Sequence, residues 1–125
     1  MALAAVTPVL RIFDLDTARA FYVDFLGFAV DWEHRHEPDL PVYMQVSREA
    51  CVLHLTEHHG DAAPGAAIRI ASSDLDALHA ELAARDYRHA RPHIEDKPWG
   101  IRELVMWDPF HNRLTFAEAV DPGEA

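Results

Sequence analysis

The chain is poor in several residue types, and each shortage excludes a class of protein. It has one cysteine in 125 residues, so no disulfide can form within it. Eleven basic residues stand against 21 acidic ones, a net charge of -10, which argues against nucleic acid as a partner. No apolar run is long enough to span a bilayer, and the first residues lack the pattern of a secretory signal. We therefore expect a cytoplasmic protein with no nucleic-acid or membrane partner.

What the chain does have is one pattern that occurs twice. Asp14-Leu15-Asp16 follows the β-branched run 9–12, and Asp74-Leu75-Asp76 follows the similar run 68–70. An apolar-periodic stretch, an aromatic residue and strand-like runs come after each acidic triplet. The size fits one domain, residues 1–125, and the repeat predicts that this domain is built from a duplicated unit.

The first half reads as strand, helix and three strands. One stripe of an amphipathic helix is predicted at Ala18, Phe21, Tyr22, Phe25 and Leu26. Asp14 or Asp16 can cap this helix, and Gly27 can end it. Alternation in the second strand predicts that Val30, Trp32 and His34 share a face. The expected strands are 7–13, 28–35, 43–47 and 51–56.

The second half repeats this order after a polar linker at 58–65. Its helix is predicted from the stripe Leu75, Leu78, Leu82 and Ala83, with Asp74 as its cap. The expected strands are 66–71, 87–94, 101–107 and 113–118. The predicted fold class is α+β, with two βαβββ modules, residues 5–58 and 66–119, forming cupped mixed sheets.

Several motifs in both halves resemble the vicinal oxygen chelate superfamily, which includes glyoxalases, extradiol dioxygenases and bleomycin-resistance proteins. The similarity is greatest to the bleomycin-resistance members. His111 stands where members usually carry glycine, a positive-φ turn position. The matching segments are 9–14 leading into 20–22, then 25–28, 73–78 and 108–114.

The resemblance implies a cup-shaped site in which metal-dependent members place one ligand on each of four strands. Those positions correspond here to Thr7, His54, Ala67 and Thr115. Alanine has no donor atom, and a threonine hydroxyl is a poor ligand for Zn²⁺, Ni²⁺ or Fe²⁺. The residues therefore argue against a metal, and no cofactor is expected.

Two other groups of residues have ordinary explanations. His34 and His36 are two residues apart on a strand end, where a metal site is conceivable but a solvated surface is the simpler interpretation. Cys51 lies in an apolar strand on the face opposite His54, which indicates a small buried residue rather than a catalytic dyad.

A candidate binding surface follows from the resemblance and from strand alternation. An arginine on a strand face needs a carboxylate, a water-filled cleft or a ligand. A Trp-Gly pair in a loop suits either stacking on a flat ligand or anchoring of the loop. Trp107 is expected in the core or at a dimer interface. The candidate ligand-binding residues are His54, Arg69, Trp99, Trp32, Tyr43 and Thr115; no catalytic or metal residue is predicted.

Three hypotheses follow for the function. The preferred one is a metal-free protein that sequesters a cationic or aromatic small molecule, such as a bleomycin-like compound, in a cleft at a homodimer interface. The alternative is a metal-dependent glyoxalase-like or dioxygenase-like enzyme that combines His54 with unusual ligands such as His34 or Glu57. The third is a protein-interaction module whose cup is filled by its own side chains.

Overall fold

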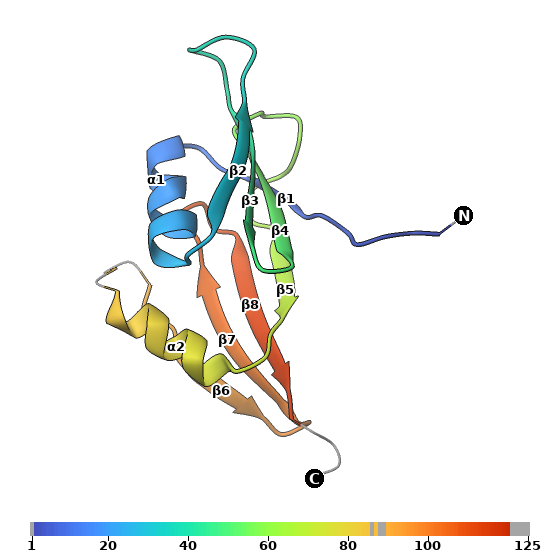
Figure 1. The fold of residues 1–125 in the computed structure, drawn as a ribbon, viewed down its shortest axis with the longest axis vertical. Helices are drawn as coiled ribbons and strands as arrows, with labels where there is room; N and C mark the ends of the chain where they lie inside the picture. Colours follow the sequence, from blue (N-terminus) through green and yellow to red (C-terminus); the bar gives the residue numbers. More distant parts are fainter. Residues whose placement is uncertain (1, 86, 88–89, 121–125) are drawn as a thin grey trace. The chain divides into compact units, whose positions relative to one another are not determined.

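The computed structural model describes residues 2–85, 87 and 90–120. The chain forms two compact units, Met1–Ala66 and Ala67–Ala125. Each unit holds a four-stranded mixed sheet with helical structure beside it (Figure 1). The two-module α+β fold predicted from the sequence is confirmed. Among the described residues, no helix combines the length and apolarity that crossing a membrane requires.

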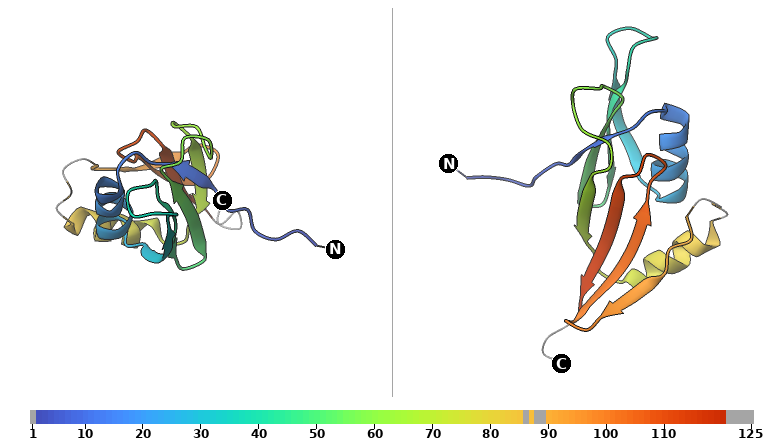
Figure 2. Two further views of the ribbon diagram at one scale, coloured as in Figure 1. Left: turned by 90° about the horizontal axis from the view of Figure 1, so that it is seen from above. Right: turned by 180° about the vertical axis from the view of Figure 1, so that it is seen from behind.

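The first unit has the sheet order β1-β4-β3-β2, with β1 parallel to β4 and the other neighbours antiparallel. Two further views show the green β4 strand running beside β3 (Figure 2). Its elements are β1 (Val9–Arg11), α1 (Leu15–Arg19), the π-helix η1 (Ala20–Phe25), β2 (Ala29–His34), β3 (Tyr43–Arg48) and β4 (Cys51–Thr56).

The helical segment of the first unit forms for the reasons that the sequence suggests. The Asp14 carboxylate accepts hydrogen bonds from the backbone N–H of Thr17 at 2.9 Å and from its hydroxyl at 2.6 Å, which caps the first turn. Gly27 ends the segment at φ 78°, a conformation that other residues adopt only with strain. All five residues of the predicted apolar stripe are buried, so this prediction is confirmed.

A β-bulge in β2 breaks the predicted alternation. Val30 pairs with Val46, but the next pair along β2 is Trp32 with Gln45, which leaves Asp31 as an extra residue. Val30 and Val46 therefore lie on the helix side of the sheet, whereas Trp32 lies on the opposite side. The prediction that Val30 shares a face with Trp32 is wrong, because the bulge shifts the register by one residue.

The second unit has the sheet order β5-β8-β7-β6, again with a parallel pair, β5 and β8. Leu75 and Leu82 of its helix are buried, whereas Ala83 is exposed, so the predicted stripe is one residue too wide. The strand predicted at 87–94 begins only at Ile94, and part of that range lies outside the described residues. The elements are β5 (Ala67–Ala71), α2 (Leu75–Ala84), β6 (Ile94–Lys97), β7 (Ile101–Trp107) and β8 (Arg113–Ala119).

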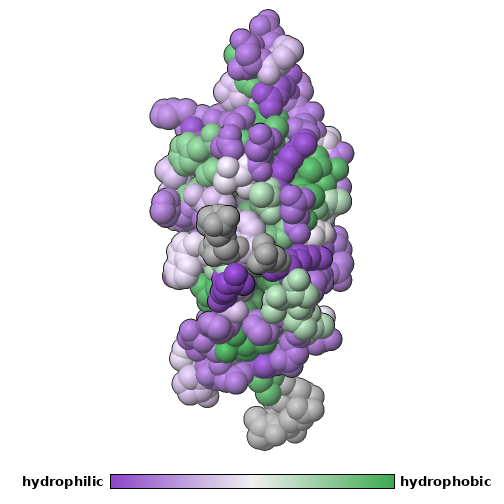
Figure 3. Space-filling model, turned by 90° about the vertical axis from the view of Figure 1, so that its left-hand side faces the viewer, coloured by the Kyte–Doolittle hydropathy of each residue, from purple (hydrophilic) through white to green (hydrophobic). Residues whose placement is uncertain are grey.

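Charged groups fasten α2 to its sheet. Asp74 caps the helix from a left-handed conformation, φ 58°. The Glu118 carboxylate, on β8, accepts hydrogen bonds from the backbone N–H groups of Asp74 at 2.7 Å and Leu75 at 3.3 Å. Arg102 on β7 pairs with Asp76 and Asp96, each at 3.0 Å. Figure 3 shows a face with mostly hydrophilic side chains and with hydrophobic groups between them.

Candidate functional site

The face of the first sheet that points away from the helix carries three of the six predicted ligand-binding residues. On β3 and β4, Met44, Val46, Leu53 and Leu55 are buried on the helix side. Strand alternation places the residues between them on the opposite face, which we call the open face of this sheet. The open face carries Tyr43, Gln45 and Ser47 from β3 and Val52, His54 and Thr56 from β4.

Three rings meet on the open face and form what we call the aromatic cluster, Trp32, Tyr43 and His54. The Trp32 and Tyr43 rings are stacked, with centroids 6.0 Å apart and an angle of 10° between their planes. The His54 ring meets both edge-on, at 5.4 Å from Trp32 and 5.2 Å from Tyr43. Trp32 remains 42% exposed, so part of the cluster is accessible from outside.

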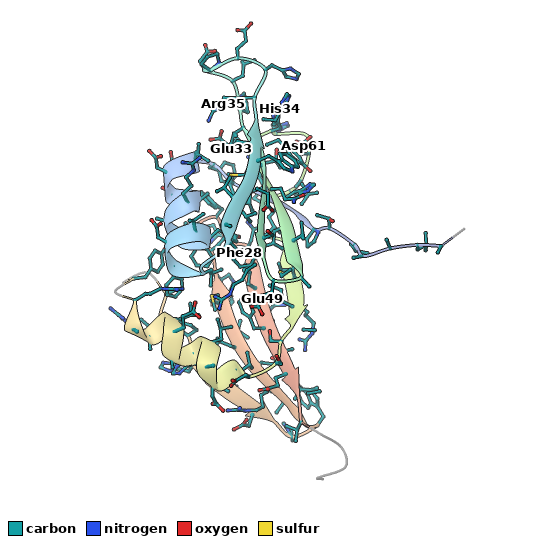
Figure 4. All side chains as sticks on the ribbon, in the orientation of Figure 1. Phe28, Glu33, His34, Arg35, Glu49 and Asp61 are labelled. Atoms are coloured by element: carbon teal, nitrogen blue, oxygen red, sulfur yellow. The ribbon has the colours of Figure 1, made fainter. Side chains whose placement is uncertain are left out.

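Both ring nitrogens of His54 are engaged. Its Nδ1 lies 2.7 Å from the Tyr43 hydroxyl, and its Nε2 lies 2.9 Å from the Gln45 side-chain oxygen Oε1. Burial first, and the negative charge of Asp61 second, raise the pKa of Tyr43 above its ordinary value. Asp61 lies in the loop after β4, where its carboxylate accepts a hydrogen bond from the Thr56 hydroxyl (Figure 4).

Asp31 completes a hydrogen-bond chain across the open face. Its carboxylate accepts from the Gln45 amide nitrogen and from the Ser47 hydroxyl, each at 3.0 Å. These two hydrogen bonds, Gln45 first, lower the pKa of Asp31, so its charged form is favoured. The bulge makes the arrangement possible, because it directs Asp31 and Trp32, which are neighbours in sequence, to the same face.

The residues at the superfamily's metal-ligand positions do not fit a metal ion. Ala67 offers no donor atom, and Thr7 and Thr115 offer only hydroxyls. The one imidazole at these positions, His54, already uses both nitrogens within the open face. In the described residues, no three side chains of the metal-binding types His, Cys, Asp and Glu gather as a ligand group. We therefore derive no chemistry through a metal.

The remaining predicted ligand-binding residues lie in the second unit. Arg69 and Thr115 are neighbours across β5 and β8. The guanidinium of Arg69 pairs with the Glu103 carboxylate at 3.0 Å, which supplies the partner that the sequence analysis required. Trp99, in the turn before β7, is 68% exposed, so it does not anchor that turn on its own sheet.

Several secondary candidates prove to be ordinary surface or structural residues. The His34 and His36 rings meet edge-on at 5.1 Å on the exposed end of β2. Glu57 is occupied, because its Oε1 accepts from the backbone N–H of Val42 at 2.9 Å. Cys51 is only half-buried, yet that burial raises the pKa of its thiol, which does not favour a reactive thiolate. Trp107 is 56% exposed, so of its two predicted places the core is wrong, and the dimer interface stays a prediction.

Sequence reasoning found the three rings but missed Gln45 and Asp31. Alternation alone places Gln45 beside His54, so its register with β4 was a usable signal. Asp31 had no such signal, because in an unbroken strand it would lie on the helix side. The dipeptide Asp31-Trp32 is brought to one face only by the bulge.

The chain is similar in sequence to a known protein family and in fold to solved structures. The family model described as "Glyoxalase superfamily protein" matches residues 1–123. The bleomycin-binding protein from the bleomycin-producing Streptomyces verticillus, solved with copper(II)-bleomycin, is 30% identical, with 93% of this chain and 96% of that chain covered and a TM-score of 0.69. A search of curated protein sequences finds no match.

Two more solved structures share the fold at lower identity. The bleomycin resistance determinant encoded on the transposon Tn5 is 22% identical, with 94% of this chain and 98% of that chain covered and a TM-score of 0.74. The antibiotic-binding protein TnmS3 from Streptomyces sp. CB03234 is 23% identical, with 95% and 98% covered and a TM-score of 0.72.

Proposed function

Because the chain belongs to the glyoxalase superfamily, we propose that it is a metal-free protein of the bleomycin-resistance type that sequesters an aromatic, cationic small molecule. The observation that carries this proposal is the aromatic cluster on the open face, with Trp32 stacked on Tyr43 and still 42% exposed. A flat ligand that stacks on Trp32 would extend an arrangement already present in the protein.

The chemistry of the cluster favours a flat, positively charged ligand. An aromatic pair contributes roughly 0.5–1.5 kcal/mol beyond the burial of its area, and a cation over a tryptophan ring contributes a similar amount. The first unit has ten acidic residues against four basic ones, so its field attracts cations. The Asp31 carboxylate lies on the same face as the rings.

The comparisons support the binding class, and bleomycin is the first compound to test. The Streptomyces verticillus relative was solved with copper(II)-bleomycin bound, and TnmS3 is described as an antibiotic-binding protein. Sequestration needs no covalent step and no resident metal, which agrees with the donors at the four superfamily ligand positions. We place the cleft at a homodimer interface, so that a second copy of the chain would supply its other wall.

Thermal unfolding in the presence of ligands tests the proposal. A ligand at one hundred times its dissociation constant stabilises the native state by about 2.7 kcal/mol, which raises the melting temperature by several degrees. We expect this rise with metal-free bleomycin or with protonated 4-dimethylaminoquinoline, a flat aromatic cation. Isothermal titration then gives the affinity, and sedimentation gives the oligomeric state with and without ligand.

Two tryptophan variants supply the matched comparison. Trp32→Ala should weaken binding roughly tenfold or more, the equivalent of about 1.4 kcal/mol. Trp107→Ala removes an equally large, exposed indole at the end of a strand outside the cluster. Once sedimentation shows that this variant has the oligomeric state of the wild type, its affinity should be unchanged. If neither bleomycin nor the quinoline cation stabilises the wild-type protein, the proposed function is wrong.

A further inference from the structure

The hydrogen-bond chain on the open face has a direction, and Asp31 sets it. A carboxylate only accepts hydrogen bonds, so the Gln45 group that faces it must be the amide NH₂, at 3.0 Å. The Gln45 oxygen is thereby turned toward His54 Nε2, at 2.9 Å. An amide oxygen only accepts, so Nε2 must carry the hydrogen.

The direction continues through the imidazole to Tyr43. In a neutral imidazole with the hydrogen on Nε2, Nδ1 is an acceptor. The Tyr43 hydroxyl, 2.7 Å from Nδ1, must then donate its hydrogen to the ring. The hydrogen of this hydroxyl points into the chain, while its oxygen keeps lone pairs for another partner.

We propose that Asp31, acting through Gln45, holds His54 in the Nε2–H tautomer, so that Tyr43 and Asp31 present hydrogen-bond acceptors and the site selects aromatic cations that carry an N–H donor. The inference rests on the proposed function and names the ligand class more narrowly. Asp31 and Gln45 are positioning residues in it, because they act on Tyr43 through His54. Donors on this face include the indole N–H of Trp32, the second amide hydrogen of Gln45 and the guanidinium of Arg11 on β1, whose Nε donates to the His58 carbonyl at 3.2 Å.

The cost of the wrong ligand follows from this polarity. A ligand that offers a lone pair to the Tyr43 oxygen meets another acceptor, so no hydrogen bond forms. A cation with an N–H group instead donates a charge-assisted hydrogen bond to that oxygen. Such bonds contribute more than neutral ones, and a desolvated acceptor without a donor is unfavourable. The selection therefore separates ligands of the same shape and charge.

Nitrogen NMR of the histidine side chains tests the tautomer directly, with no ligand needed. At a pH well above the usual imidazole range, we expect the wild-type His54 signals to report hydrogen on Nε2 and a bare Nδ1. Asp31→Asn removes the constraint, because an amide both donates and accepts, and should raise the population of the other tautomer. Asp31→Lys places a donor before Gln45 and should reverse the preference.

A matched control separates this effect from the loss of a negative charge. Asp24→Asn removes the same charge from an exposed position on η1 and should leave the His54 tautomer as it is in the wild type. Hydrogen on Nδ1 in the wild type, or an unchanged tautomer in both Asp31 variants, would overturn the inference. Far-ultraviolet circular dichroism checks that each variant is folded.

A pair of probes tests the ligand preference. Protonated 4-dimethylaminoquinoline and its N1-methyl cation have the same flat ring system and charge, but only the first has a ring N–H. We expect the wild type to prefer the N–H cation roughly tenfold and Asp31→Asn to lose most of this preference. The lost charge of Asp31 weakens both cations, so the quantity compared is the ratio of the two affinities in each protein.

The outcomes distinguish this inference from the function on which it rests. If the wild type binds both cations with equal affinity, the selection by hydrogen-bond donors is wrong and the proposed function stands. If it binds neither cation and no bleomycin, the proposed function fails together with the ligand preference. The NMR result decides the role of Asp31 in either case.

Discussion

The turn between β7 and β8 depends on one buried carboxylate, that of Asp108. Exchanging the residues at positions 108 and 112 should reveal how much the hydrogen bonds of this carboxylate contribute to stability. Asp108 is 4% exposed, and Asn112 is fully buried. Asp108 Oδ1 accepts from the backbone N–H groups of Phe110 and Asn112, and its Oδ2 accepts from the Asn112 side-chain amide, all at 2.8 Å. Asp108→Ala leaves three donors in a buried turn without this acceptor.

The magnitude follows from the cost of an unsatisfied donor. Each buried donor that loses its partner costs about 1–3 kcal/mol, and three at one site do not add fully. We expect Asp108→Ala to lower the free energy of unfolding by about 3 kcal/mol or more. Asp108→Asn keeps the Oδ1 acceptor but sets its NH₂ group against that of Asn112, so a loss of about 1–2 kcal/mol is expected.

The exchanged pair is the sharper experiment. In the double variant Asp108→Asn with Asn112→Asp, the new amide at 108 donates to the new carboxylate at 112, while its oxygen still accepts both backbone N–H groups. Urea unfolding followed by circular dichroism should place the double variant within about 1 kcal/mol of wild type, with each single variant less stable. A double variant as unstable as the sum of the two singles would refute the role assigned to this hydrogen-bond geometry.

Three further predictions address acid stability, backbone strain and metal removal. The pKa of Asp76 is lowered from 3.8, chiefly by its hydrogen bond with Arg102, so its contribution to stability is present above 3.8 and is lost as the pH falls toward and through the lowered pKa of the folded protein. Acid titrations should therefore show Arg102→Met losing less stability than wild type between about pH 5 and pH 3. Gly100 has φ 86° with open space where a Cβ would lie, so Gly100→Ala should cost about 1–2 kcal/mol in urea unfolding, whereas Gly60→Ala, without a positive φ, should not. Treatment with EDTA should leave the calorimetric affinity for an aromatic cation unchanged, and a loss of affinity that Zn²⁺ restores would contradict the metal-free site.

Much of the fold could be predicted because its signals are local. The buried stripe from Ala18 to Leu26, the cap at Asp14 and the left-handed Gly27 each follow from a residue type at a known spacing. His111 adopts φ 69°, as expected for a turn position where relatives have glycine. The strands Cys51–Thr56 and Ile101–Trp107 have the predicted bounds.

The missed features depend on register rather than on residue type. No local pattern marks Asp31 as an extra residue in β2, since the bulge is defined only by pairing with β3. Strand alternation therefore could not predict that Asp31 and Trp32 lie on the same face. The same holds for the His54 chain, whose members come from three strands and meet through cross-strand pairs. The ring residues were predictable as candidates, and alternation could have placed Gln45 beside His54, but nothing in the sequence marked Asp31.

The parallel pairs β1–β4 and β5–β8 have a consequence for the order in which the chain acquires structure during synthesis. Val9 pairs with His54, and Ala67 pairs with Arg113. The first strand of each unit, β1 or β5, therefore cannot pair until the last strand, β4 or β8, has left the ribosome. The start of α2 is completed equally late, because its first N–H groups donate to the Glu118 carboxylate, which is synthesised with β8. Closing such long loops is slow, so each βαβββ unit should emerge as an unfinished intermediate and complete itself in one late step.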